Sequence, residues 1–389
     1  MELGWGPGDE AFRAELAAFL DANAPAEALG HDFAQDERVD GIPKWARAWQ
    51  ALLFDSGWLV PSYPPELGGR NATAVQSLIY MEELAKRGLP RAFHFPGYAI
   101  VAPSLLEFGT DRQLELVPAA LRGDTVWCIG MSEPNAGSDL GSLTTRAVLD
   151  GDTFIVNGQK VWTSYAMWAQ LCFCYVRTDP DAAKHKGISV LIIDMDSDGI
   201  DIRPLRHING NAEFAEVFFT DVEVPMTNLV GDLNGGWRIT MGSLAHERGG
   251  LWVQGVSGLE HALADLIKLA KETGQDTDPV VRRKLAEAYV TVRSLRALGY
   301  KGFSSFAQGS SSPEHSYLKL ATSEQGKALY ELGLEISGGP AIVTDTGWAP
   351  GSGRWMRSFF TSFASTIAGG TSEIQRNIIA ERILGLPRG

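Results

Sequence analysis

The sequence is poor in cysteine and lacks any long apolar run. Its 389 residues include three cysteines, Cys128, Cys172 and Cys174, all in apolar stretches typical of strands. This odd number predicts buried thiols in a reducing compartment rather than a disulfide framework, and a Cys-x-Cys pair alone is weak evidence for a metal site. No run reaches the roughly 20 apolar residues of a membrane span. The N-terminus, MELGWGPGDEAF, has neither the basic nor the apolar segment of a signal peptide, so we expect a cytoplasmic protein that does not enter a membrane.

Positive charge is also in short supply. The chain has 34 Lys and Arg residues against 47 Asp and Glu residues, a formal net charge of −13, so nucleic acid is not an expected partner. The histidines are scattered without the His-x-His or His-x-x-x-His spacing of metal ligands, and no metal site is expected. No P-loop and no Gly-x-Gly-x-x-Gly follows a strand-like run, which argues against a nucleotide held on a Rossmann unit.

What the sequence does have is a change of hydrophobic period along the chain. Residues 1–123 carry helical patterns, residues 124–232 carry the alternation of strands, and helical patterns return over residues 233–389. These ranges are the three predicted domains. The last one contains four long helical patterns, at about 237–273, 279–308, 313–337 and 354–385, which predict a helical bundle. The predicted fold class is α+β, mainly α, with an antiparallel β domain between two helical domains.

The stretch from Trp127 to Ser164 has the most functional content. It reads WCIGMSEPNAGSDLGSLTTRAVLDGDTFIVNGQKVWTS, which predicts a short strand, a loop and then a hairpin that turns at Gly151-Asp152. A loop rich in free backbone N–H groups and small hydroxyls can bind an anion such as a pyrophosphate, and the ring of Trp162 can stack on a planar ligand. On the residues alone, an ordinary strand connection and a core tryptophan remain open alternatives.

This stretch resembles the FAD-dependent acyl-CoA dehydrogenases. In that family the loop reads (T/S)EPxAGSD and the strand reads KxWx(T/S), and here they read SEPNAGSD and KVWTS. The resemblance extends from the first helical pattern to the C-terminus. It implies the acyl-CoA dehydrogenase fold: an N-terminal α-helical domain, a middle antiparallel β domain and a C-terminal four-helix bundle. It also implies an FAD enzyme that acts on an acyl-CoA.

The resemblance assigns flavin contacts in the loop and on the strand. Trp162 and Ser164 match positions that flank the isoalloxazine and bond near its N5 atom. Ser138 belongs to both the cofactor set and the substrate set. The loop residues that match positions meeting the flavin or the bound thioester are Met131, Ser132, Gly137 and Ser138.

Further cofactor contacts are implied nearer the C-terminus. Thr371 and Glu373 match positions that contact the nucleotide end of FAD, and Gly338-Gly339 matches a turn by which one subunit touches its neighbour's FAD. Each has a plainer alternative. Glu373 can be a carboxylate stabilised by a helix N-terminus, and Gly338-Gly339 can be a simple turn after a helix.

The expected catalytic base stands at a different position from that of most relatives. Removal of the α proton of a thioester needs a carboxylate beside the substrate. Most relatives carry this Glu immediately before the Gly-Thr of a C-terminal motif, where this sequence, IAGGTSEIQ, has Gly369. Isovaleryl-CoA and long-chain relatives instead use a Glu that precedes an Arg, which Glu247-Arg248 in HERGG matches. The resemblance therefore implies Glu247 as base, with Arg248 and Gly369 contacting substrate; a surface ion pair is the alternative for Glu247.

Other departures from the family concern the acyl group and the neighbouring subunit. Ala368 stands where relatives usually carry Tyr beside the thioester, which is compatible with a long, branched or ring-bearing acyl group. The family's Arg-x-x-Phe-Gly segment is not visible between Leu251 and Arg283, and Glu335 replaces a Gln that faces the neighbour's cofactor. These departures leave the inter-subunit half of the FAD site open.

The predicted function is the α,β-dehydrogenation of an acyl-CoA to the trans-2-enoyl-CoA. Glu247 would take the α proton, and electrons would pass to an electron-transferring flavoprotein. The expected assembly is a homodimer or homotetramer. Two alternatives stay open: a flavin oxidase or monooxygenase on the same fold, and a non-catalytic FAD-binding subunit of a hetero-oligomer, which Gly369 fits if Glu247 is only structural.

Overall fold

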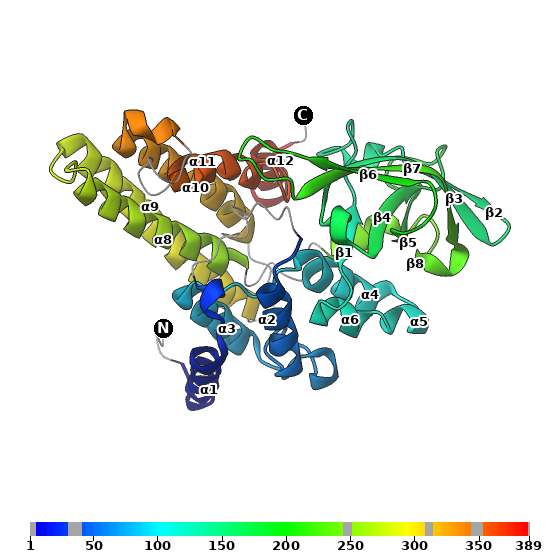
Figure 1. The fold of residues 1–389 in the computed structure, drawn as a ribbon, viewed down its shortest axis with the longest axis horizontal. Coiled ribbons are helices and arrows are strands. Elements are labelled where there is room, and N and C mark those ends of the chain that lie inside the picture. The colour runs from blue at the N-terminus through cyan, green and yellow to red at the C-terminus, as the bar shows by residue number, and fades with distance from the viewer. Residues whose placement is uncertain (1–4, 30–40, 244–250, 308–313, 344–352, 388–389) are drawn as a thin grey trace. The chain divides into compact units, whose positions relative to one another are not determined.

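The computed structural model describes residues 5–29, 41–243, 251–307, 314–343 and 353–387 (Figure 1). The chain divides into two compact units. One contains residues 18–77 and 89–247, which include the β-sheet; the other contains residues 1–17, 78–88 and 248–389, which include the helical bundle. None of the described helices is long and apolar enough to cross a bilayer.

The N-terminal region is helical, as predicted, and its helices bury one face each. Helix α2, for example, buries Ala46, Trp49 and Leu53, which are spaced three and four residues apart. The bounds are α1 Pro7–Asn23, η1 Ala26–Ala28, α2 Lys44–Asp55, η3 Pro65–Leu67, α3 Ala74–Arg87, η4 Gly97–Val101, α4 Ala102–Phe108, α5 Asp111–Leu114 and α6 Val117–Arg122.

The middle region forms an eight-stranded sheet (Figure 1). The order of its main path is β6-β7-β3-β2-β4-β5-β8, and β1 pairs with β4. The strands are β1 Trp127–Gly130, β2 Arg146–Asp150, β3 Thr153–Ser164, β4 Leu171–Arg177, β5 Ile188–Asp194, β6 Ile200–Leu205, β7 Phe214–Pro225 and β8 Leu229–Val230, with η5 Leu140–Ser142, η6 Ala166–Trp168 and η7 Met226–Asn228 between them.

The prediction of an antiparallel sheet is wrong at one place. Strand β1 pairs with β4 in parallel, in register from Trp127–Leu171 to Gly130–Cys174, and β2 also meets β4 in parallel at Arg146. Parallel neighbours need a long connection, and the loop and the β2–β3 hairpin between β1 and β4 supply it. The predicted hairpin itself is confirmed, since Asp150 pairs with Thr153 across a two-residue turn.

The core of the sheet is apolar and contains the three thiols. Cys128, Cys172 and Cys174 are fully buried and form no disulfide. They belong to the same core cluster as Phe154 and Val217. The hydrogen bond to Cys172 and, after it, burial raise the pKa of the Cys174 thiol well above its ordinary value. The cysteines are therefore inert core side chains, as the sequence predicts.

The C-terminal region is a helical bundle in which α10 packs against α8, α9 and α11. In Figure 1, the long helices α8 and α9 lie along one another. The bounds are α8 Leu251–Glu272, α9 Pro279–Ala307, α10 Glu314–Ser337, η8 Gly339–Ile342, α11 Arg354–Ser365, α12 Ser372–Ile378 and the π-helical η10 Ile379–Ile383.

One of the predicted long helices differs from the structure, and another is only partly described. The pattern over 354–385 is not one helix, because the chain turns between α11 and α12 at Gly369 and Gly370, whose φ angles are +66° and +93°. Only glycine adopts such angles without strain. The pattern over 237–273 contains α7 Gly236–Ser243 and α8, and the residues between them lie outside the described part of the chain.

Candidate functional site

A buried ion pair anchors the loop that follows β1. The Lys160 ammonium on β3 lies 2.9 Å from Oε1 of Glu133, and both side chains are buried. Burial tends to raise the pKa of the Glu133 carboxyl, but Lys160 and the hydrogen bonds from Thr144 and Thr145 outweigh it and lower this pKa to about 2. Glu133 is therefore an ionised anchor at neutral pH and not a proton acceptor.

The far part of the same loop is open to solvent. Gly137 and Ser138 are exposed, and a Cβ atom built on Gly137 would have no neighbour within 4 Å. Nearby, Asp139 accepts hydrogen bonds from Lys184 Nζ at 2.7 Å and from Ser142 Oγ at 2.6 Å, and the Lys184 contact is the largest cause of its lowered pKa. The loop thus presents bare backbone at Gly137-Ser138 while its ends are fixed.

Trp162 is turned out of the sheet by an irregularity in β3. The pairing of β3 with β7 shifts register between Lys160 and Thr163, Trp162 has φ +61°, and 60% of its surface is exposed. Its ring meets the edge of Phe214 at 6.0 Å and 89°. The core interpretation of this tryptophan is therefore wrong, and a strained, exposed ring at a strand end indicates a ligand contact.

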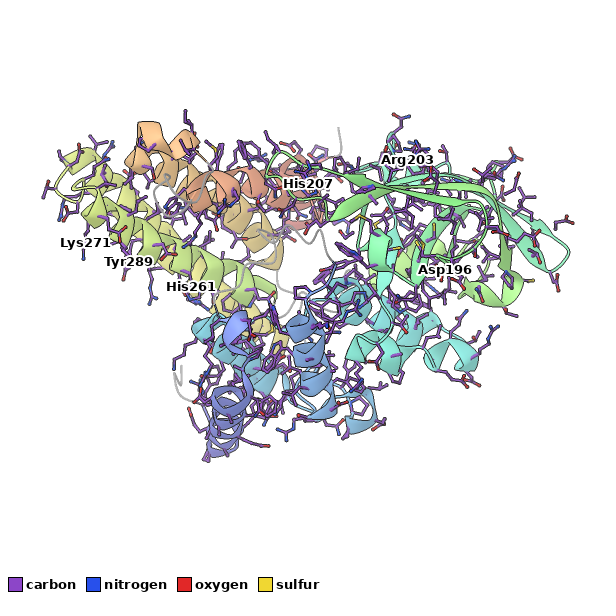
Figure 2. The ribbon with its side chains drawn as sticks, viewed as in Figure 1. Asp196, Arg203, His207, His261, Lys271 and Tyr289 are labelled. Atoms are coloured by element: carbon purple, nitrogen blue, oxygen red, sulfur yellow. The ribbon has the colours of Figure 1, made fainter. Side chains whose placement is uncertain are left out.

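The aromatic contacts of Trp162 continue to a histidine. Phe214 stacks on His207, which is labelled in Figure 2, and the two ring centroids are 4.7 Å apart. Burial lowers the pKa of His207. Ser164, the other predicted flavin contact on this strand, is half-buried and pairs with Phe214 across the sheet. The structure therefore brings the predicted strand contacts and an aromatic stack together at one end of β3.

The same irregular stretch also touches the loop. Val161 N–H donates to the carbonyl oxygen of Ser132 at 2.9 Å, and Lys160 Nζ donates to that of Met131 at 3.2 Å. Met131 and Ser132 are half-buried. Met131 and Ser132 therefore lie beside the part of β3 that carries Trp162.

In the bundle, the turn between α11 and α12 holds two more predicted substrate contacts, Ala368 and Gly369. Ala368 and Gly369 are exposed, and a Cβ atom on Gly369 would meet only Lys319 Cε, at 4.0 Å. The turn is fixed from behind, because Gln375 Nε2 donates to the Gly369 carbonyl at 3.0 Å and Lys319 Nζ donates to the Gly370 carbonyl at 2.6 Å. Burial lowers the pKa of Lys319.

Helix α12 begins immediately after this turn. Thr371 is its N-cap and accepts a hydrogen bond from Ile374 N–H at 3.2 Å. Glu373 is exposed, and its own backbone N–H, followed by Thr371 and Arg376, lowers the pKa of its carboxyl. Glu373 thus is a carboxylate in the first turn of a helix, the alternative that the sequence offered, and this geometry leaves its exposed oxygens available to a ligand.

The predicted neighbour-facing turn follows α10. Gly338 has φ +64°, and Gly339 is the first residue of η8. Both glycines are exposed, and a Cβ atom built on either would have no neighbour within 4 Å. On α10, Glu335 forms an ion pair with Lys284 of α9. The turn is therefore accessible, and the carboxylate at position 335 is held by a cation from its own chain.

A pocket of about 320 Å³ lies within the bundle, between α8, α10 and the end of α11. Gly255 and Gly258 leave one wall without side chains, and Lys319 and Tyr330 contribute polar groups. The full set of lining residues is Gln254, Gly255, Gly258, Leu259, Lys319, Thr322, Ser323, Tyr330 and Ser365.

Sequence reasoning missed three charged residues, Glu133, Lys160 and Lys319, and it assigned two that the structure does not describe. Glu247 and Arg248 lie outside the described residues. Of the three that were missed, only Lys160 carries a signal in the sequence, since a lysine between apolar positions of a strand is rarely buried unless it has a partner.

Comparison with protein families places the whole chain in one group. Models of the N-terminal, middle and C-terminal domains of acyl-CoA dehydrogenases match residues 7–124, 128–222 and 234–384. Among curated proteins, the chain is 35% identical to acyl-CoA dehydrogenase IpdE1 of Mycolicibacterium smegmatis, with 97% of each chain covered. It is 36% identical to IpdE1 of Mycobacterium tuberculosis, covering 97% of this chain and 98% of the relative.

Solved structures agree with these matches. The fold superimposes on a structure titled Tcur3481-Tcur3483 steroid ACAD with a TM-score of 0.85 and 31% identity, over 100% of both chains. It also superimposes on the ChsE4-ChsE5 complex from Mycobacterium tuberculosis with a TM-score of 0.83 and 32% identity, again over 100% of both chains.

Proposed function

Since this chain belongs to the acyl-CoA dehydrogenase family, FAD-dependent oxidoreductases that act on acyl-CoA, we propose that it converts an acyl-CoA thioester to the trans-2-enoyl-CoA. The observation that carries the proposal is the pair of features at the end of β3. There an exposed, strained Trp162 stands on the strand that hydrogen-bonds the loop residues Met131 and Ser132. These features suit a planar cofactor against the ring and an anion against the loop.

The residues present fit FAD. Gly137 leaves room for close approach to the backbone, and the exposed Trp162 offers a flat apolar face. When bound, FAD would accept the hydride from the β carbon. The residues proposed to hold it are Met131, Ser132, Gly137, Ser138, Trp162, Ser164, Thr371 and Glu373, with Gly338 and Gly339 serving a neighbouring subunit.

Glu247 is the proposed base that removes the α proton. The turn at Gly369 has no side chain that accepts a proton, and Lys319 behind it donates a hydrogen bond to the Gly370 carbonyl. The Glu247-Arg248 pair supplies a carboxylate and a guanidinium next to each other in the sequence. Arg248 and Ser138 would contact the substrate. Backbone N–H groups near Gly369 would polarise the thioester carbonyl, because hydrogen bonds to developing negative charge lower the barrier.

The acyl group is proposed to be bulky and ring-bearing. Ala368 is small and exposed in the turn, and the bundle pocket has two glycines in its wall. A solved relative of 31% identity is titled a steroid ACAD. A ring system needs a wide cavity, which small lining side chains provide. A straight acyl chain does not need that width.

Electrons are proposed to leave to an electron-transferring flavoprotein, and the chain is proposed to form a homo-oligomer. A hetero-oligomer with a second acyl-CoA dehydrogenase-like chain is the alternative. It is favoured by two observations: a relative of 32% identity is titled a two-protein complex, and Glu335 stands at a position where many relatives carry a Gln that faces the neighbour's cofactor.

The proposal is tested by anaerobic titration of the purified yellow protein with a panel of acyl-CoA thioesters. Straight-chain, branched and ring-bearing acyl groups should be compared, with bleaching of the flavin as the signal. We expect complete bleaching with a ring-bearing thioester and reoxidation by an electron-transferring flavoprotein. No bleaching by any thioester would contradict the proposed reaction, and rapid reoxidation by air would favour an oxidase or monooxygenase instead.

A further inference from the structure

The ion pair between Glu133 and Lys160 is buried, and both partners form further hydrogen bonds. Besides Lys160, the Glu133 carboxylate accepts hydrogen bonds from Thr144 N–H at 2.6 Å, from Thr144 Oγ1 at 2.8 Å and from Thr145 N–H at 2.8 Å. Lys160 is 0% exposed and donates to Met131 as well as to Glu133. A buried ion pair adds little stability compared with well-packed apolar side chains of similar volume. Stability therefore does not explain why two charges lie in this core.

The segments that the ion pair joins explain why two charges lie in this core. The Glu133 side chain ties the beginning of the loop to its end at Thr144-Thr145, and Lys160 ties the loop to β3. The irregularity that turns Trp162 outward begins at Lys160. One buried pair therefore fixes two segments at once: the loop backbone at Met131-Ser132 and the strand end that carries Trp162.

The hydrogen bond to Met131 also sets the direction of a backbone donor. The Met131 carbonyl points at the Lys160 ammonium, 3.2 Å away. In a planar trans peptide the carbonyl and the following N–H point in opposite directions. The Ser132 N–H is therefore aimed away from the ion pair, on the side of the loop opposite the buried charge.

We propose that Glu133 and Lys160 are positioning residues of the flavin site, which together aim the Ser132 N–H and the Trp162 ring at the cofactor. The proposal rests on the proposed function, since it takes the loop and Trp162 as flavin contacts. Neither residue touches the cofactor. Their effect is carried by the loop backbone and by the outward turn of β3.

Three variants separate positioning from simple stability: Lys160→Met, Glu133→Gln and the double variant K160M/E133Q. Each single change leaves one partner without its counter-charge, so both should lower the melting temperature strongly. The double variant has no buried charge and should recover most of that loss. Its dissociation constant for FAD should stay raised by about tenfold or more, a factor that corresponds to 1.4 kcal/mol. The visible circular dichroism of its bound flavin should also differ from that of the wild type.

A control variant in the bundle guards against a general effect of destabilisation. Arg296 of α9 is partly buried, forms an ion pair with Glu260 and donates to Ser257 Oγ at 2.8 Å. Arg296→Met should lower the melting temperature while leaving FAD affinity and the flavin spectrum unchanged, when measured well below the transition. Equal losses of FAD affinity in R296M and K160M/E133Q would overturn the positioning role.

The outcomes also separate this inference from the function on which it rests. A double variant with the FAD affinity and flavin dichroism of the wild type would overturn the positioning role alone. A wild-type protein that binds no FAD would overturn both the proposed function and the positioning role.

Discussion

Trp127 and Trp162 lie near the two ends of one stretch of sequence and serve opposite purposes. Trp127 is fully buried at the start of β1, whereas Trp162 is exposed and has φ +61°. Burial of a large aromatic ring is worth about 3–5 kcal/mol relative to Ala, and a left-handed backbone costs a non-glycine residue about 1–2 kcal/mol. Trp162 therefore adds little burial energy to the stability of the fold, and its backbone strain lowers that stability. A bound ligand is the reason we infer for its conformation.

Replacing Trp162 with Gly tests this directly. We expect an unchanged or slightly higher melting temperature, because Gly adopts a positive φ without strain. The dissociation constant for FAD should rise by about tenfold, the equivalent of 1.4 kcal/mol of lost contact. Calorimetry and flavin fluorescence titration measure the two effects. Trp127→Ala is the control and should lose about 3–5 kcal/mol of stability. Normal FAD binding by W162G would contradict the assignment.

His94 predicts a pH dependence of folding. It is fully buried, its Nε2 accepts a hydrogen bond from Trp127 N–H at 2.8 Å, and burial lowers its pKa from 6.5 to about 4. Above pH 6.5 both folded and unfolded chains carry neutral His94, so its contribution is constant. Between pH 6.5 and 4 the His94 imidazole binds a proton in the unfolded chain but stays neutral in the folded chain. Stability should therefore fall by a total of about 3 kcal/mol on acidification through this range.

The measurement is a series of urea unfolding curves across that pH range, on the wild type and on His94→Gln. In the variant, the free energy of unfolding should depend less steeply on pH over this range, because Gln does not titrate. An identical slope in both proteins would show that His94 is not its source.

At the scale of elements, the turn between α11 and α12 contains Gly369, which we propose to stand at the position of the usual base. Gly369 has a positive φ but open space around its missing Cβ, whereas a Cβ on Gly370 would meet Gln375 Nε2 at 2.8 Å. A longer side chain at 369 is thus sterically possible at a cost of about 1–2 kcal/mol in backbone strain. At 370 a side chain would displace the Gln375 amide, which donates a hydrogen bond to the Gly369 carbonyl.

This difference predicts a rescue. In a Glu247→Gln background, adding Gly369→Glu should restore part of the lost flavin bleaching by acyl-CoA, because a carboxylate returns to the position that most relatives use. Gly370→Glu in the same background is the matched control and should restore none. Stopped-flow bleaching under anaerobic conditions measures all three proteins. Failure of G369E to restore any bleaching, in a protein that still binds FAD, would contradict the interpretation of this turn as the vacated base position.

Much of this element structure could be predicted, and the failures have physical causes. The hairpin follows from a turn signal between alternating runs, and the break after α11 had a visible signal in Gly369-Gly370. The Glu133–Lys160 contact had none, since it depends on how the loop folds back onto β3. The exposure of Trp162 was also out of reach. Strict alternation assigns faces by parity, and a register shift between Lys160 and Thr163 overrides it.

At the scale of the whole molecule, Glu335 is the residue we propose to face the neighbour's half of the FAD site. Its carboxylate is paired with Lys284, and the adjoining turn at Gly338 is exposed. If copies of this chain complete one another's sites, this carboxylate lies close to an anionic cofactor and weakens its binding by repulsion.

Glu335→Gln should therefore raise the FAD affinity of the chain purified alone, by about two- to tenfold for a gain of about 0.4–1.4 kcal/mol. Glu331→Gln, one turn earlier on α10 and also exposed, is the control and should have no effect. Bound FAD per chain and the mass in solution are the measurements. An unchanged affinity in E335Q would contradict a self-complementing homo-oligomer and favour a second, different chain as partner.

The most direct measurement is the rate of flavin bleaching by a ring-bearing acyl-CoA in the wild type and in Glu247→Gln, under anaerobic conditions and with substrate binding measured in parallel. A side chain that takes the proton in the rate-determining step contributes about 10²–10⁴-fold. We predict a loss of that size in the variant, with FAD and thioester still bound. Bleaching at the wild-type rate in Glu247→Gln would contradict the central claim that Glu247 is the catalytic base.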